Sequence, residues 1–346
     1  MKITTANLCL LPDMNISKTK FLQVVRQQVF LRVATGGPGL AASFSLMLAL
    51  VLSAPATGCA ADTGRTFSTP DEAVAALAAA VNANDTNALN EIFGPALADI
   101  RNPDRVQAAN NLQMFATALD ATNQLVQESD TRYELDVGTN DWPFPIPLVK
   151  GEDGQWFFDT KAGEEEILNR RNGRNELDTL QTVRAYVEAQ REYASRDRDG
   201  SGVLKYAQRL FSSPGTEDGL YWPPDLTGDI SPLGPLVADA RVEGYGNKSE
   251  GTNVGPQPYH GYYFKILTRQ GKHAPGGKYN YIINGNMIGG FALVAWPAEY
   301  GNSGIMTFIV NQQGRVYQKD LGTKTGKLAP AMKRYDPDAT WQLSPD

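Results

Sequence analysis

The stretches FALVAW (residues 291–296) and IMTFIVN (residues 305–311) decide the fold of the C-terminal half. Each is a short run of apolar, β-branched and aromatic residues, which is the composition of a strand inside a sheet. Three further runs of this kind lie nearby, at 261–268, 278–284 and 314–321. The turn from Asn311 to Gly314 indicates a tight hairpin. The pattern predicts an antiparallel sheet of four or five strands.

A helix precedes these strands, from Leu177 to about Ser195, because Leu180, Val183 and Val187 recur at helical spacing. The mixed-charge stretch 163–176 before it is interpreted as the join between two domains. The Gly- and Pro-rich passage 212–258 is predicted to be an extended wrap or a functional arm. One helix on an antiparallel sheet resembles the headgroup of type IV pilins, although no long apolar helix leads into this one.

The N-terminal half has the opposite order, with helices first and short strands after them. Thr69-Pro70-Asp71-Glu72 predicts a capped helix start, and strands are expected between 125 and 159. This order resembles the nuclear-transport-factor-2-like group. We therefore expect an α+β protein of two domains: a helix-first cone-like domain at 59–170 and a helix plus antiparallel-sheet, pilin-headgroup-like domain at 171–346 with its long arm at 212–258.

Residues 1–58 are interpreted as a signal peptide with an upstream extension. Lys18, Lys20, Arg26 and Arg32 precede an uncharged run at 40–54, which is too short to span a bilayer. The run ends in Ala56-Thr57-Gly58-Cys59, which resembles the lipobox of bacterial lipoproteins. The resemblance implies that Cys59 carries an acyl anchor on the periplasmic side of the envelope. The alternative is ordinary cleavage near Ala56 or Ala60, which would release a soluble periplasmic protein.

Composition excludes several classes of function. The formal charge is −6 with a pI near 5.2, and removing residues 1–58 takes away five basic groups and one acidic group, so that 32 basic against 38 acidic side chains becomes 27 against 37. Such an acidic chain does not attract nucleic acid, and only acyl chains would hold it at a membrane. Two Cys and two His cannot build a cysteine zinc cluster or a three-His metal site.

Several longer blocks resemble a family of bacterial exported proteins. They include WFFDTKAG (156–163), HGYYF (260–264) and WPAEYGNSG (296–304). The chain is similar over about 67–321 to the domain-of-unknown-function family numbered twenty-nine fifty. The resemblance implies export and a two-part layout, and it brings no established activity, cofactor or site residue.

Four places offer binding chemistry, and each has a simpler explanation. Asp197, Asp199 and Ser201 have the spacing of the first calcium ligands of a loop, but Gln208 stands where a bidentate Glu belongs. A solvated turn is the alternative, and no other cofactor is expected. A hydrolase would need His260 or His273 beside Ser303, but the serine lacks the G-x-S-x-G spacing, so that turn chemistry is favoured.

The loop 274–277 between Lys272 and Lys278 is either a backbone nest for an anion or a simple hairpin loop. The excess of aromatic residues predicts a binding platform with Trp296, Glu299 and Tyr300 at its rim, or else cross-strand packing.

Two functions of different class follow. The favoured one is a non-catalytic, lipid-anchored envelope protein whose second domain or arm binds an envelope protein or a cell-wall polymer. The alternative is an enzyme or small-ligand carrier with a pocket in the first domain, for which the lining candidates are Phe93, Phe115, Tyr133, Trp142 and Trp156. Because 59–259 contains no His, a histidine base is excluded from that half.

Overall fold

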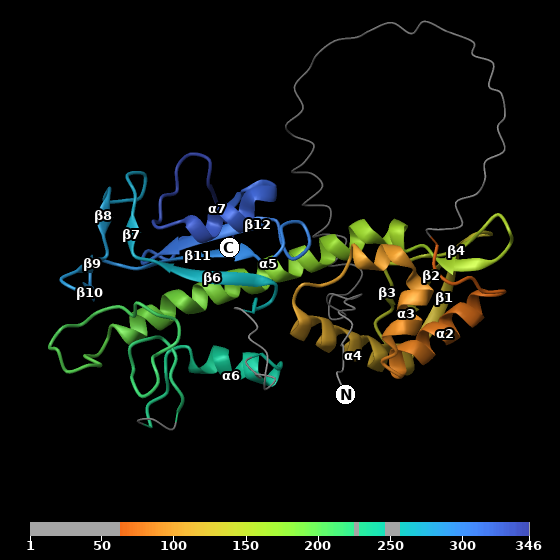
Figure 1. The fold of residues 1–346 in the computed structure, drawn as a ribbon, viewed down its shortest axis with the longest axis horizontal. Helices are drawn as coiled ribbons and strands as arrows, with labels where there is room; N and C mark the ends of the chain where they lie inside the picture. The colour runs from red at the N-terminus through yellow and green to blue at the C-terminus, as the bar shows by residue number, and fades with distance from the viewer. Residues whose placement is uncertain (1–62, 225–227, 246–256, 346) are drawn as a thin grey trace, which may run out of the picture. The chain divides into compact units, whose positions relative to one another are not determined.

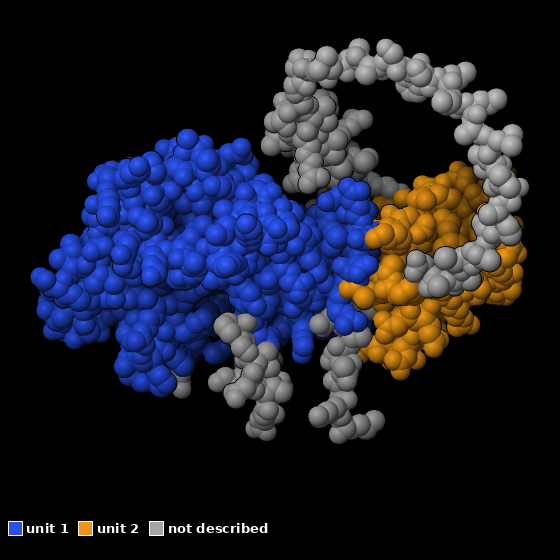
Figure 2. Space-filling view, turned by 45° about the horizontal axis from the view of Figure 1, so that its top comes forward, with its two compact units in different colours: residues 1–12, 99–114, 164–346 blue, residues 13–98, 115–163 orange. Residues whose placement is uncertain are grey.

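The computed structural model describes residues 63–224, 228–245 and 257–345. This part of the chain divides into two compact units (Figure 2). Unit 1 comprises residues 99–114 and the described residues from 164 onward, and unit 2 comprises residues 63–98 and 115–163. The leader at 40–54, Cys59 and residues 246–256 of the arm lie outside the described residues. Of the described helices, none combines the length and the apolar character that crossing a bilayer requires.

The fold is α+β, as predicted, with helices before the sheet in unit 2. Helix α2 (Pro70–Asn82) starts with the predicted cap, since the Thr69 side chain accepts from the Glu72 N–H at 3.2 Å and the Glu72 carboxylate accepts from the Ser68 N–H at 3.1 Å. Asp85 caps α3 (Thr86–Phe93), which ends at Gly94 in the left-handed region (φ 70°). The 3-10 turn η1 (Pro95–Ala98) follows.

The sheet of unit 2 is antiparallel, with the order β1-β2-β4-β5 and β3 paired to β2. Its strands are β1 (Asn123–Ser129), β2 (Arg132–Val137), β3 (Trp142–Pro143), β4 (Leu148–Lys150) and β5 (Trp156–Phe158). Aromatic side chains fill the interior of this unit. The Phe144 ring lies 5.2 Å from that of Phe115, 6.1 Å from Phe158 and 6.2 Å from Phe93, and all four rings are at most 2% exposed. They form a packed core.

The expectation that a helix begins at Leu177 was wrong, because helix α5 runs without a break from Thr160 to Tyr193. The stretch 163–176 begins at the boundary between the two units. It has few apolar residues because it presents polar side chains to the loops of unit 1. Asn172 donates to the Gly301 carbonyl at 2.9 Å, Asn175 donates to the Ser303 carbonyl at 2.9 Å, and the Glu176 carboxylate accepts from the Ile305 N–H at 2.9 Å. These bonds satisfy loop backbone groups that would otherwise be unpaired.

The antiparallel sheet predicted for unit 1 is confirmed, with the order β14-β13-β12-β11-β6; Figure 1 labels β6, β11 and β12. The run 278–284 was wrongly expected to be part of it, because it forms β8 (Tyr279–Asn280) and β9 (Ile282–Ile283) in two smaller sheets, and β14 was not predicted. Its strands are β6 (Tyr262–Leu267), β11 (Ala292–Pro297), β12 (Met306–Asn311), β13 (Tyr317–Asp320) and β14 (Gln342–Leu343). All six residues of β11 are buried. Helix α5 packs on this sheet, since the Tyr186 ring contacts the Phe291 ring at 5.6 Å and its hydroxyl donates to the Ala292 carbonyl at 3.2 Å.

Part of the described arm packs into unit 1. Leu220 and Trp222 are at most 1% exposed and belong to the core of unit 1. The short helix α6 (Gly234–Val242) follows, and the sequence pattern did not predict it. After α6, this described part of the arm ends at Tyr245. Because apolar side chains of the arm are buried, the packing of the arm contributes to the hydrophobic stability of unit 1.

A buried carboxylate joins three segments of unit 1. Asp104 is 1% exposed, and one of its oxygens accepts from the N–H groups of Val106 and Gln107 at 3.1 Å, which caps α4 (Arg105–Ala121). Its other oxygen accepts from the Tyr245 hydroxyl at 2.7 Å and from the Gly261 N–H at 3.0 Å. The arm, the start of α4 and the start of β6 therefore share one acceptor group.

Candidate binding site

A small sheet lies at one end of unit 1 and is built around strand β7 (Arg269–Gln270). On one side β7 pairs with β8 (Tyr279–Asn280), so that Arg269 is opposite Asn280 and Gln270 is opposite Tyr279. On the other side the Tyr335 N–H donates to the Arg269 carbonyl at 2.9 Å, and the Gly271 N–H donates to the Tyr335 carbonyl at 2.8 Å. Strands β9 (Ile282–Ile283) and β10 (Asn286–Met287) form the adjoining hairpin.

Buried polar contacts hold this small sheet in place. The Gln270 side chain is 1% exposed, donates to the carbonyls of Pro275 and Gly277 at 2.7 Å, and accepts from the Tyr281 hydroxyl at 3.0 Å. A Cβ at Gly271 would lie 2.1 Å from the Asp336 carboxyl carbon, so only glycine permits this close approach. The predicted hairpin loop 274–277 is confirmed, and Gln270 takes up two of its carbonyl groups.

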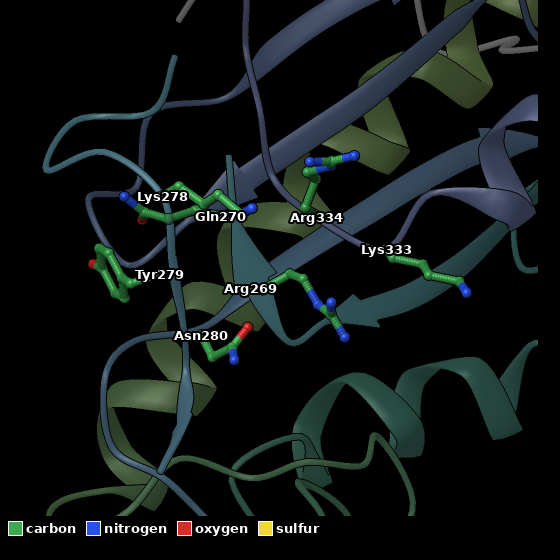
Figure 3. A pocket seen from close by; sticks show the side chains of 7 residues that line it. All are labelled: Arg269, Gln270, Lys278, Tyr279, Asn280, Lys333 and Arg334. Atoms are coloured by element: carbon green, nitrogen blue, oxygen red, sulfur yellow. The ribbon is translucent and has the colours of Figure 1, made fainter. Parts of the chain in front are cut away.

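A cavity of about 380 Å³ opens on this small sheet (Figure 3). Its lining includes four basic side chains from three segments. They are Arg269 on β7, Lys278 just before β8, and Lys333 and Arg334 just before Tyr335, the residue that pairs with Gln270. Gln270, Tyr279 and Asn280 complete the lining. Within the described chain none of the four cations takes part in an ion pair or a side-chain hydrogen bond. The cavity therefore presents unneutralised positive charge.

Strand alternation explains why three of these four charges share a face. Arg269 and Asn280 are cross-strand partners and share a face, and Lys278 lies two residues from Asn280 on that face. Tyr335 forms a parallel bridge with the buried Gln270. Arg334, one residue before Tyr335, therefore lies on the same face as Arg269, one residue before Gln270. The sequence pattern pointed to Lys278 but not to Arg269, Lys333 or Arg334. Only the adjacent basic pair at 333–334 gives a sequence signal, and that signal is weak.

The predicted platform residues lie at the C-terminal end of β11 and in the turn that follows it. Trp296 is 9% exposed and its ring contacts the Tyr263 ring at 5.9 Å. The Tyr300 hydroxyl donates to Asp320 at 3.2 Å, and the exposed Glu299 carboxylate accepts from the Asn302 amide at 2.9 Å. A binding role for these residues stays a prediction.

The predicted calcium loop is held by its own hydrogen bonds. Asp197 accepts from the N–H groups of Ser201 at 3.2 Å and Gly202 at 2.7 Å. Asp199 is paired with Lys205, and this hydrogen bond holds the pKa of the Asp199 carboxyl below its usual value. No group of three or more His, Cys, Asp or Glu side chains suited to a metal ion occurs in residues 63–345 where the structure describes them. The calcium site stays a prediction.

Ser303 and His273 have turn and loop roles. The Ser303 hydroxyl accepts from the Glu299 N–H at 3.0 Å and donates to the Glu299 carbonyl at 3.2 Å, as expected for a turn. The His273 N–H donates to Asp336 at 2.9 Å, and its ring lies 3.1 Å from the same oxygen. Neither residue is placed as a nucleophile or its base in this arrangement.

His260 has two carboxylate partners that the sequence did not reveal. Its Nδ1 lies 3.2 Å from Asp178 on α5, and its Nε2 lies 3.0 Å from Glu243 just after α6. Residues 260 and 261 both have positive φ, 47° and 73°, in the tight turn that pairs Tyr259 with Tyr262. Since His adopts this region rarely, the two carboxylates hold a strained turn in place.

The electrostatic environment favours the charged imidazolium. Burial lowers the pKa of His260, but the hydrogen bond to Asp178 and the charges of Asp178, Glu243 and Asp104 outweigh it, so that the pKa of His260 is raised. Burial raises the pKa of Asp178, but hydrogen bonds and charges from His260 and Arg174 outweigh it, so that the pKa of Asp178 is lowered. The rings of Tyr245 and Tyr259 also lie against the His260 ring, with centroids at 5.7 Å and 4.3 Å.

We expect the stability contributed by His260 to decrease at high pH. Because its pKa is higher in the folded than in the unfolded chain, the contribution is complete below about pH 6.5 and is lost as the pH rises through the raised value. His260→Gln should lower the free energy of unfolding by about 1–2 kcal/mol at pH 5.5 and by less at pH 9. Urea unfolding at both pH values measures the difference.

His273→Gln is the control, since the side chain of His273 is 41% exposed and has one carboxylate partner. A loss for His260→Gln that is the same at both pH values would contradict the assignment of a charged imidazolium.

The family model for proteins of unknown function (DUF2950) matches residues 64–343. The protein belongs to this family. No curated protein and no solved structure matches the chain.

Proposed function

We propose that this protein is an exported, lipid-anchored protein of the bacterial cell envelope that binds an anionic component of that envelope without catalysing a reaction. The uncharged run at 40–54 and the lipobox-like residues before Cys59 support export and anchoring, from the sequence alone. The family to which the chain belongs is one of unknown function and assigns no biochemical role.

The observation that carries the binding function is the basic cavity. In a chain of net charge −6, four unpaired cations line one cavity of about 380 Å³. Like charges held together without counter-charges repel one another, and an anion bound among them removes that repulsion. An anionic partner is therefore the ligand that this cavity would stabilise most.

The composition of the lining favours binding over catalysis. Arg, Lys, Tyr, Gln and Asn side chains line the cavity. General acid–base catalysis needs a group with a pKa near the working pH, a role for which His and carboxylates are the usual choice. The cavity thus offers binding groups without such a pair.

The alternative, a ligand pocket inside the first domain, is less well supported. Three of its five candidate lining residues, Phe93, Phe115 and Trp142, are at most 4% exposed and pack around Phe144. The cavity of about 240 Å³ in unit 2 lies instead beside α2 and β1, where Val74, Ala78 and Leu125 are among its lining residues.

Retention on immobilised polyanions tests the binding function. We expect the purified full-length chain to bind polyglutamate or poly(glycerol phosphate) resin at low salt and to elute with NaCl, because the cations are exposed to screening. It should not bind neutral dextran resin. Equal behaviour on the charged and neutral resins would contradict the proposal.

Detergent fractionation with acyl labelling tests the anchor. We expect the wild-type protein to take up labelled acyl chains and to partition with membranes, and Cys59→Ser to appear in the soluble periplasmic fraction without label. Equal release of both proteins into the soluble fraction would refute lipid anchoring. Unprocessed protein inside the cell would refute export.

A further inference from the structure

We infer that the basic cavity of unit 1 is a phosphate-binding site, which takes phosphomonoester or phosphodiester groups in preference to carboxylates. This inference rests on the proposed function and names the chemical class of anion. Its basis is the combination of two Arg and two Lys side chains with two neutral amide side chains around a single cavity.

The cations approach the cavity from different segments of the chain. Arg269 lies on the central strand β7, Lys278 comes from the β8 side, and Lys333 and Arg334 come from the segment on the opposite side of β7 (Figure 3). A phosphate group offers acceptor oxygens in a tetrahedral arrangement, so donors from several directions can bind it together. A carboxylate offers two oxygens in one plane, which one Arg fork already satisfies.

The amount of charge also favours phosphate. Four cations exceed what one monoanionic carboxylate neutralises, whereas a phosphomonoester carries up to two charges and a phosphodiester chain brings one charge per repeat. Asp336 is the acidic residue that follows Lys333, Arg334 and Tyr335 in the chain. Its carboxylate already accepts a hydrogen bond from the His273 N–H and contacts the His273 ring. The ligand must therefore supply the counter-charge.

Neutral donors and exposure complete the site. The Asn280 amide stands opposite Arg269 on the same face and can donate to a phosphate oxygen or an adjoining hydroxyl. The four cations and Asn280 are all exposed. A phosphate that remains part of a longer molecule, such as a glycerol phosphate polymer or a lipid headgroup, can therefore reach them without burial of the whole ligand.

Calorimetric titration of the purified full-length chain distinguishes the anion classes and their sources. The probes are poly(glycerol phosphate), polyglutamate of equal charge, inorganic phosphate, and phosphatidylcholine vesicles with and without phosphatidylglycerol. We expect phosphate-bearing probes to bind at least about tenfold more tightly than polyglutamate at equal salt. Tighter binding to the polymer, to the vesicles or to free phosphate identifies the source, and each of these results supports the inference.

Other results separate the two proposals. Equal affinity for polyglutamate and poly(glycerol phosphate) would overturn the phosphate preference and leave anion binding intact. No binding to any charged probe would overturn both.

Paired variants locate the binding in the cavity. R269Q/R334Q should weaken poly(glycerol phosphate) binding at least about tenfold. R269K/R334K keeps the charge but removes both forks, and it should fall between the wild type and R269Q/R334Q. The matched control is K324Q/K327Q, which removes two exposed cations of unit 1 outside the cavity lining. An equal loss in the control would overturn the site, and urea unfolding establishes that all four proteins fold alike.

Discussion

Asp104→Ala is expected to lower the free energy of unfolding by about 3–5 kcal/mol, the largest effect of any single polar substitution considered. The buried carboxylate accepts four hydrogen bonds, from the N–H groups of Val106, Gln107 and Gly261 and from the Tyr245 hydroxyl. Alanine would leave these donors without an acceptor in a site that is 1% exposed. Urea unfolding followed by circular dichroism measures the change.

Two further variants separate the parts of this effect. Asp104→Asn keeps one oxygen for the α4 cap but places an amide donor against the Tyr245 hydroxyl and the Gly261 N–H, so about 2–3 kcal/mol should be lost. Asp85→Ala removes an exposed helix cap with two hydrogen bonds and should cost about 1 kcal/mol. If Asp104→Ala costs no more than Asp85→Ala, Asp104 does not join the three segments as described.

Phe144→Ala is expected to lower the free energy of unfolding of unit 2 by about 3–5 kcal/mol. Its ring is 2% exposed and contacts the rings of Phe93, Phe115, Phe158 and Trp142. Removing it leaves a cavity among aromatic side chains that cannot close without disturbing each other. Thermal and urea unfolding of the full-length chain report the loss.

Conservative and surface substitutions complete this test. Phe144→Leu retains much of the volume and should cost about 1.5 kcal/mol. Phe211→Ala removes a ring that is 63% exposed and should change stability by less than about 1 kcal/mol. A small effect of Phe144→Ala, with ligand-dependent stabilisation of that variant and of the wild type, would instead support an open pocket in unit 2.

Four of the five strands of the large sheet of unit 1 were predictable because they have a local signature, whereas β14 consists of two exposed residues and has none. The runs at 291–296 and 305–311 became β11 (Ala292–Pro297) and β12 (Met306–Asn311), displaced by one residue at most. A strand buried on both faces needs continuous apolar sequence, and that requirement can be read without knowing its neighbours. The cap at Thr69 was predictable for the same reason, since it involves residues within four positions of one another.

The start of α5 was not predictable by the same reasoning. The stretch 163–176 has the composition of a linker because Asn172, Asn175 and Glu176 are polar. Their hydrogen-bond partners lie 128 to 129 residues further along the chain, at Gly301, Ser303 and Ile305. Local periodicity contains no information about such partners, so the pattern did not predict that the helix extends through this stretch.

By itself, the sequence determined the α+β class, four of the five strands of the large sheet, the capped helix at Pro70 and the acidic charge of the protein, because each depends on residues close together in the chain or on composition. Tertiary structure alone decided the partners of His260 and the basic cavity. Arg269, Lys278 and Arg334 are separated by up to 65 positions, and they lie together only because Gln270 is opposite Tyr279 and beside Tyr335. Strand pairing over such distances depends on the packing of the whole unit, which no local pattern specifies.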